Sequence, residues 1–302
     1  MNIISSIPAA PRGARQATLE PRGGFTLVEV LIALVLTAVV GAAVTSVFVS
    51  QNAFYDTQEQ VTEARAVSRA ATNMMLTELR AVETTDGIIA AGADSLRVKV
   101  PFAIGVSCGV ASGNLHVSII PVDSVTWAQG RANYAGYAWR DPATGTYSSQ
   151  ASGSISNAAS GGRCATQSPP ITTTYAAMNG RSHVVQLVSP SSGTVEVAAA
   201  VMLYNIVTYR FDDSGLLPGE RGLFRQVEGG AAEELAAPFD ASARFRFYEV
   251  SEVDAQDAPP TDIDDLRGVE LVLTGRSDRP GADGNRQLTP LTTAIFFRNR
   301  VD

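Results

Sequence analysis

The chain shows three successive patterns of hydrophobic and polar positions. The first is a run of twenty residues, Val30 to Val49, that holds no charge and no proline. At ~1.5 Å of rise per residue, a helix of this run is ~30 Å long, which is the thickness of the hydrocarbon core of a bilayer. We therefore predict a membrane-spanning helix over residues 25–50, preceded by a leader of residues 1–24.

The second pattern is amphipathic and begins after residue 50. Apolar residues recur at spacings of three, four or seven positions, with charged residues between them, as on a helix with one buried face. This apolar stripe consists of Phe54, Val61, Ala64, Val67, Ala71, Met75, Leu79 and Val82. Since Gly41 is the only glycine or proline between Phe25 and Val82, we predict one helix of about 58 residues. Its part over residues 51–83 should pack on a folded domain.

The third pattern, from Asp94 onward, alternates apolar and polar residues as half-buried strands do. The segments are residues 95–100, 115–120, 183–188, 195–211, 223–227, 243–250, 268–275 and 291–298, with turn residues between them. Phe245 and Phe247 should face inward, and Arg244, Arg246 and Tyr248 outward. A long helix followed by antiparallel strands predicts an α+β fold, in which the helix covers a β-rich domain of residues 84–302.

Residues 141–182 do not follow the strand pattern. They are rich in Gly, Ser, Ala and Thr and show little periodicity. We expect a long loop there, and loops of that length are often functional or disordered.

Charge and composition narrow the class of protein. Of the 302 residues 45% are hydrophobic, which indicates a globular chain. Three arginines and one glutamate give the leader a net charge of +2. Because the whole chain has a net charge of −7, the residues after the leader carry −9. This acidic balance argues against a nucleic-acid partner. The basic leader predicts a cytoplasmic N-terminus, with the β-rich domain on the other side of the bacterial inner membrane.

The two cysteines, Cys108 and Cys164, and the two histidines follow no zinc-ligand spacing, so we expect no metal and no cofactor. An exported domain lies in an oxidising compartment, which favours a disulfide between Cys108 and Cys164. This bond would close a loop of about 57 residues and stabilise the fold by ~4 kcal/mol on the chain-entropy model. The alternative is two separate buried thiols.

Hydropathy alone leaves three readings of the apolar run: a retained spanning helix, a secretory signal peptide cleaved near Gly41, or a simple signal anchor. Glu29 lies one residue before this run. A signal peptide and a signal anchor both leave this carboxylate unexplained, because neither gains from a charge beside its apolar segment.

The stretch "RGGFTLVEVLIAL", residues 22–34, resembles the signal of type IV prepilins. The resemblance implies that a prepilin peptidase cleaves between Gly24 and Phe25, that Phe25 is then N-methylated, and that the helix is retained. It also implies assembly with other pilins or pseudopilins through an inner-membrane assembly platform. Glu29 stands at the fifth position of the processed chain, where the family has an assembly glutamate.

Processing supplies a physical reason for Glu29. Cleavage creates an α-amino group at Phe25, with an unperturbed pKa of about 8, at the start of an apolar helix. A carboxylate four positions later would pair with this ammonium in the same chain or in a neighbouring subunit. The alternative is that Glu29 only extends to the membrane interface.

The C-terminal third resembles, more weakly, the minor pilins and pseudopilins of the J/W kind, and "AIFFRNR" at residues 294–300 is similar to their last strand. The segment after the helix lacks the Gly-Tyr-Gly-Cys-like run of the W type, which favours the secretion-type J class. The resemblance implies a non-enzymatic structural subunit of a type IV pilus or a type II secretion pseudopilus, in a tip or initiation complex.

Two other functions stay open at this stage. A pilus-tip binding module, either an adhesin or a DNA-uptake pilin, would use the aromatic cluster of residues 127–139 or the long loop. A membrane-anchored periplasmic enzyme would need a catalytic motif, and the sequence shows no nucleophile elbow, phosphate loop or zinc-protease motif. The acidic residues between Asp254 and Asp265 and the turn at 277–285 are either calcium sites or solvated loops, and neither has EF-hand spacing.

Overall fold

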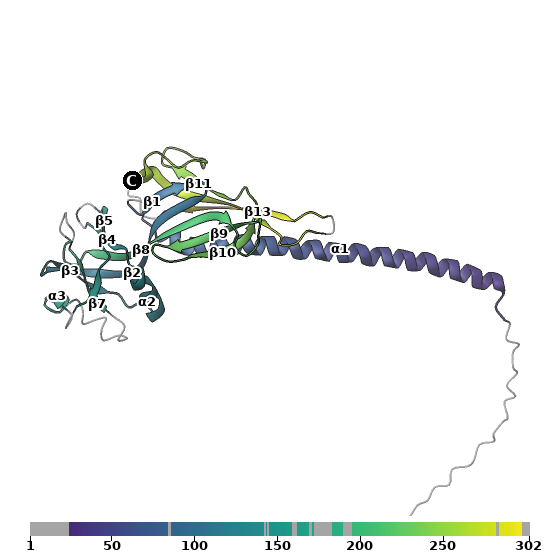
Figure 1. The fold of residues 1–302 in the computed structure, drawn as a ribbon, viewed down its shortest axis with the longest axis horizontal. Coiled ribbons are helices and arrows are strands. Elements are labelled where there is room, and N and C mark those ends of the chain that lie inside the picture. Colours follow the sequence, from purple (N-terminus) through teal and green to yellow (C-terminus); the bar gives the residue numbers. More distant parts are fainter. Residues whose placement is uncertain are drawn as a thin grey trace, which may run out of the picture. The chain divides into compact units, whose positions relative to one another are not determined.

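Helix α1, Leu27–Leu79, is the first element of this computed structural model (Figure 1). The structure describes residues 24–83, 86–141, 143, 145–158, 162–168, 171, 183–189, 195–281 and 284–297. The chain divides into two units, Met1–Asn52 and Ala53–Asp302, and α1 contributes to both. The predicted long N-terminal helix is confirmed, whereas the leader before Gly24 lies outside the described residues.

In the first unit, the helix buries none of its side chains. Every large apolar side chain from Leu27 to Val49 is between 48% and 78% exposed. The hydroxyl of Thr37 donates to the Ala33 carbonyl at 2.7 Å, and that of Thr45 donates to the Gly41 carbonyl at 2.8 Å. Both threonine hydroxyls thus have a hydrogen-bond acceptor within the helix, as polar groups in an apolar environment require. By length and composition this part of α1 is able to span a membrane.

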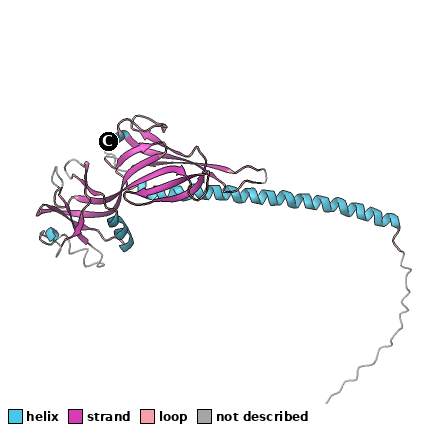
Figure 2. Ribbon diagram, in the orientation of Figure 1, coloured by secondary structure: helices cyan, strands magenta, loops and turns pink. Residues whose placement is uncertain are grey.

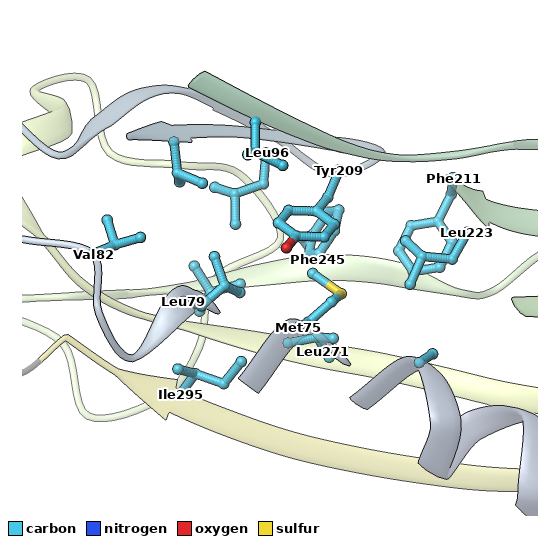
Figure 3. Close-up of a cluster of buried hydrophobic side chains, with 14 of the residues drawn as sticks. Met75, Leu79, Val82, Leu96, Tyr209, Phe211, Leu223, Phe245, Leu271 and Ile295 are labelled. Atoms are coloured by element: carbon cyan, nitrogen blue, oxygen red, sulfur yellow. The ribbon is translucent and has the colours of Figure 1, made fainter. Parts of the chain in front are cut away.

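In the second unit, α1 buries one face against a β-sheet. The buried residues are Gln60, Ala64, Ser68, Ala71, Thr72, Met75 and Leu79. Figure 3 shows Met75 and Leu79 beside Tyr209 and Phe245, which strands of the sheet contribute. The predicted stripe is confirmed from Ala64 onward, whereas Phe54 is not part of the core because it is 61% exposed.

The buried face of α1 is small and polar where it meets Gly275. A Cβ atom at Gly275 would lie 2.0 Å from the Ala64 carbonyl oxygen and 2.6 Å from the Ser68 hydroxyl. The helix backbone therefore lies directly against this strand, and larger side chains would not fit. Ser68 and Thr72 donate their hydroxyls to carbonyls one turn earlier, Ala64 at 3.4 Å and Ser68 at 2.9 Å, so their burial leaves no unpaired hydroxyl.

The second unit is built from antiparallel strands and short helices (Figure 2). The elements of its first half are β1 (Ile88–Gly92), β2 (Ser95–Ala111), β3 (Asn114–Ile119), α2 (Ser124–Ala132), β4 (Gly136–Arg140), β5 (Tyr147–Ala151), β6 (Ile155–Asn157), α3 (Gly162–Ala165) and β7 (His183–Val188). Those of its second half are β8 (Ala200–Asp213), β9 (Arg221–Val227), β10 (Ala232–Phe239), β11 (Arg244–Glu249), the 3-10 turn η2 (Ile263–Asp265), β12 (Leu266–Arg276) and β13 (Leu288–Phe296).

The strands form one sheet with the order β11-β12-β10-β9-β8-β2-β3-β7-β6, and β1, β4, β5 and β13 attach beside this path. All described strand pairs are antiparallel, which confirms the α+β fold. Phe245 and Phe247 are buried, and Arg244, Arg246 and Tyr248 are half-buried on the opposite face, as predicted.

Two hydrophobic cores lie on this sheet. The first core packs on α1 and defines the first lobe, residues 53–101 and 205–297. The second core contains Leu115, Tyr137 and Leu203 and defines the second lobe, residues 102–204. The long strands β2 and β8 pass through both lobes and pair from Ser95–Arg210 to Val106–Ala200.

The prediction of an irregular loop over residues 141–182 needs correction. Its described residues include β5, which pairs with β4, and β6, which pairs with β7. Most side chains of β5 and β6 are exposed or half-buried, so these strands leave no apolar alternation in the sequence. Residues 172–182 lie outside the described part of the chain.

Candidate functional site: the start of helix α1

The first turn of α1 is closed by a reciprocal pair of hydrogen bonds. The backbone N–H and the hydroxyl of Thr26 both donate to Oε2 of Glu29, each at 3.1 Å. The N–H of Glu29 donates in return to the Thr26 hydroxyl at 3.3 Å. This is a capping box, which satisfies N–H groups that a helix start leaves without partners and typically contributes about 1 kcal/mol.

Sequence reasoning considered Glu29 either as the partner of a charge created by processing or as a side chain that extends to the membrane interface. The structure shows a second role, because its carboxylate already caps the helix and lies near the positive end of the helix dipole. The pattern Thr-x-x-Glu immediately before an apolar run was the signal that could have predicted this.

Gly24 and Phe25 precede the helix and are exposed, Phe25 by 86% of its surface. A Cβ atom at Gly24 would meet nothing within 4 Å. The structure therefore places the Gly24–Phe25 bond outside the helix, immediately before the capping box.

The predicted disulfide is present. Cys108 of β2 and Cys164 of α3 are bonded, with their Cα atoms 4.9 Å apart and both residues fully buried. Gln167 donates to the carbonyl of Cys108 at 2.8 Å, which adds a second link between the same segments. The bond fastens the segment around α3 to the sheet of the second lobe.

The aromatic cluster of residues 127–139 does not form a binding surface. Trp127, Tyr134, Tyr137 and Trp139 are all buried in the second core. The Tyr137 hydroxyl donates to the carbonyl of Val188 at 2.8 Å, so its polar end is paired as well. Packing is therefore the role that the structure supports for these side chains.

Neither acidic segment gathers a metal site from described residues, among which no group of three or more His, Cys, Asp or Glu side chains is placed to hold an ion. Asp257 instead pairs with Arg244 at 3.2 Å and Arg246 at 2.9 Å. Slight burial opposes ionisation, but the two guanidinium groups outweigh it and lower the pKa of Asp257. Asp283, in the second segment, lies outside the described residues.

A polar cluster joins the two lobes. The Lys99 ammonium donates to Ser149 at 2.8 Å and to Asp86 at 2.7 Å, and the Ser149 hydroxyl donates to Asp86. The Lys99 ammonium also lies 5.5 Å from the ring centre of Tyr204. Lys99 thus forms an ion pair with Asp86 and donates a hydrogen bond to Ser149, and this hydrogen bond links β2 to β5.

Comparison with known families gives a match at the N-terminal end of the chain. Residues 21–45 match the family model described as "Prokaryotic N-terminal methylation motif". No curated protein and no solved structure matches the chain. The matched residues include the Gly24–Phe25 bond, the capping box and much of the exposed apolar run. Among the described residues one helix, α1, is long and apolar enough to span a membrane and so to anchor the chain, and its start carries the N-terminal methylation motif that is typical of type IV prepilin-like pilins.

Proposed function

We propose that this protein is a minor pilin or pseudopilin that assembles through its N-terminal helix into a type IV pilus or a type II secretion pseudopilus. Prepilin peptidase cleaves between Gly24 and Phe25, and Phe25 is then N-methylated. The observation that carries the proposal is the methylation-motif match at residues 21–45, which coincides with an exposed Gly24–Phe25 bond ahead of a capped helix.

The exposed apolar surface of Leu27–Val49 supports assembly through this helix. The large apolar side chains here are 48% to 78% exposed, and contact of such a continuous apolar surface with water is unfavourable unless another apolar surface covers it. Lipid covers them in the inner membrane, and helices of other pilins cover them in the filament, which the assembly platform builds. The Cys108–Cys164 bond is consistent with a periplasmic β-domain, since disulfides persist in oxidising compartments.

The hydrogen bonds of Glu29 support its pairing with the new charge at Phe25. Both Thr26 donors contact Oε2, and Oε1 accepts no hydrogen bond from the described residues. Oε1 therefore remains available for an ammonium, which belongs either to Phe25 of the same chain or to that of a neighbouring subunit. A charge pair of this kind lowers the cost of placing both groups in the membrane interior.

Processing is tested by Gly24→Ala. Because a Cβ atom at Gly24 meets no described residue within 4 Å beyond its chain neighbours, the substitution should leave the helix start intact and change only the residue that the peptidase recognises. We expect the full-length precursor to accumulate on immunoblots of cells that contain the peptidase. Gly41→Ala, which also meets nothing within 4 Å, is the matched control and should be processed normally. Normal cleavage of the Gly24 variant would refute the assigned cleavage site.

The charge on Glu29 is tested separately from its capping role. Glutamine also closes a capping box, so Glu29→Gln removes the charge and keeps the cap. We expect normal processing but loss of incorporation into sheared filaments. Thr26→Ala removes a cap donor and keeps the charge, and should retain incorporation. If Glu29→Gln assembles as well as the unmodified protein, the charge-pairing role is wrong.

A further inference from the structure

Two adjacent aromatic side chains, Phe54 and Tyr55, are exposed at the start of the second unit. Phe54 is 61% exposed and Tyr55 is 69% exposed, and their ring centres lie 6.1 Å apart in an edge-to-face arrangement. Both precede Gln60, the first buried residue of α1. The β-domain therefore does not cover them.

The other exposed positions on this part of the helix differ from the aromatic pair. Beyond Tyr55 most of them are polar, charged or alanine, for example Glu59, Arg65 and Arg69. An exposed pair of aromatic rings in this place is thus an exception among the exposed positions of this part of the helix. Two apolar rings and one hydroxyl are most favourably placed in an environment that is partly apolar and partly polar.

The position of the pair in the sequence identifies that surrounding. No charged residue occurs between Glu29 and Asp56, a stretch of 26 residues. As a helix this stretch is ~39 Å long, whereas the hydrocarbon core takes up ~30 Å and the whole bilayer with its headgroups ~40–45 Å. The apolar run ends at Val49, and polar uncharged residues follow at 50–52. The aromatic pair then falls at the depth of the lipid headgroups.

We propose that Phe54 and Tyr55 form an aromatic anchor that binds the headgroup–hydrocarbon boundary of the membrane on the side of the β-domain. Aromatic rings with a polar end are enriched at this boundary, where the ring contacts acyl chains and the hydroxyl contacts headgroups and water. The anchor fixes how far α1 is inserted into the membrane. This inference rests on membrane anchorage and not on filament assembly, so it stands or falls independently of the proposed function.

The test uses the full chain in vesicles of phosphatidylcholine and phosphatidylglycerol, with Tyr55→Trp as a fluorescent reporter. Lipids brominated at a shallow or a deep acyl position quench a tryptophan at the matching depth. We expect the signal added by Trp at residue 55 to be quenched more by the shallow bromines than by the deep ones. The native Trp127 and Trp139 are buried, and the unsubstituted protein provides their background.

Met74→Trp is the matched control, because Met74 is also exposed on α1 but lies nineteen residues further along. We expect the shallow quenching at residue 55 to exceed that at residue 74 by at least about twofold. Equal quenching at the two positions would overturn the proposal. Quenching at residue 55 that falls as the protein-to-lipid ratio rises would overturn it too, because a second copy of the chain would then be covering the pair.

Discussion

The two parts of helix α1 follow opposite rules of burial. From Leu27 to Val49 most side chains are apolar, and every large apolar one is exposed. From Gln60 to Leu79 the buried side chains include Ala64, Ser68 and Thr72, which are small or polar. Hydrophobicity alone would assign the core to the first part and the surface to the second.

The difference lies in what covers each part. The second part carries its partner in the same chain, since β12 presents Gly275 and lets the helix backbone approach closely. Dense contact between backbones then takes the place of large side chains. The first part is covered by nothing in the described chain and depends on lipid or on other helices. Stability of the folded domain should therefore respond to changes in the second part only.

The largest effect is expected for Met75→Ala. Met75 is fully buried between α1 and the sheet, and removal of such a side chain typically destabilises by about 3 kcal/mol. Leu36→Ala is the counterpart in the first part, where Leu36 is 59% exposed, and should leave the free energy of unfolding of the β-domain unchanged. Denaturant unfolding of the full chain in detergent micelles, followed by near-ultraviolet circular dichroism, compares the two. Equal losses would show that the two parts are stabilised in the same way.

A somewhat smaller loss, of about 2 kcal/mol, is expected for Gly275→Ala. The added methyl group clashes with backbone and pushes the helix off the strand, as overpacked cores do. Gly153→Ala is the control, because a Cβ atom at Gly153 meets nothing within 4 Å. The same unfolding measurement should show a change within about 0.5 kcal/mol for this control. A Gly275 variant as stable as the control would mean that close approach is not what holds the helix.

The capping box should contribute about 1 kcal/mol, and only locally. Thr26→Ala should speed hydrogen exchange of the first amides of α1, since it removes the acceptor of the Glu29 N–H. Thr37→Ala removes only a bond to the Ala33 carbonyl and should leave those amides unchanged. Unaltered exchange in the Thr26 variant would indicate that the box does not hold the helix start.

The smallest effect is expected at Glu63, which faces the loop after β12. Burial and then the neighbouring Asp278 carboxyl raise the pKa of Glu63 above 4.5, and Arg279 opposes this only in part. Since the pKa is higher in the folded state, protonated Glu63 stabilises the fold below about pH 4.5, and that contribution is lost as the pH rises through the raised pKa.

Glu63→Gln should therefore be slightly more stable than the unmodified chain at pH 7, by less than about 1 kcal/mol, and not below pH 4.5. Thermal unfolding at both pH values measures the difference, with the exposed Glu59→Gln as a control. A gain that is equal at the two pH values would contradict the ionisation argument.

The sequence predicted the elements whose burial is periodic. The long helix and strands such as β11 and β12 follow from alternation alone, because each has one apolar face. β10 was missed, since most of its side chains are exposed or half-buried and one of its residues is Pro238. The burial of Ser68 and Thr72 was missed for a different reason. Their hydroxyls donate to carbonyls of the same helix, so these polar residues can be buried without an unpaired hydroxyl, and the hydrophobic pattern of the sequence does not show this.

For the candidate site, the sequence supplied the residues and the structure supplied their contacts. Gly24, Phe25 and Glu29 were found from the motif, whereas the role of Thr26 depends on hydrogen bonds at the helix start. The exposure of Phe54 could not be predicted, because helical spacing places this residue near the apolar stripe. How far the sheet extends along α1 determines which residues of the stripe are buried, and the sequence does not show this.

The long strands β2 and β8 also determine how the domain carries mechanical tension. Their ladder extends from Ser95–Arg210 to Val106–Ala200 and lies partly in each lobe. Antiparallel hydrogen bonds run perpendicular to the strands, so a pull along the strand axis loads many of them at once in shear. A force applied to the second lobe would thus reach the lobe that holds α1 through this ladder, which is interrupted by one register shift, between Pro101 and Ala103. We expect the two lobes to yield together in a pulling experiment, because ladder pairs lie on both sides of this shift.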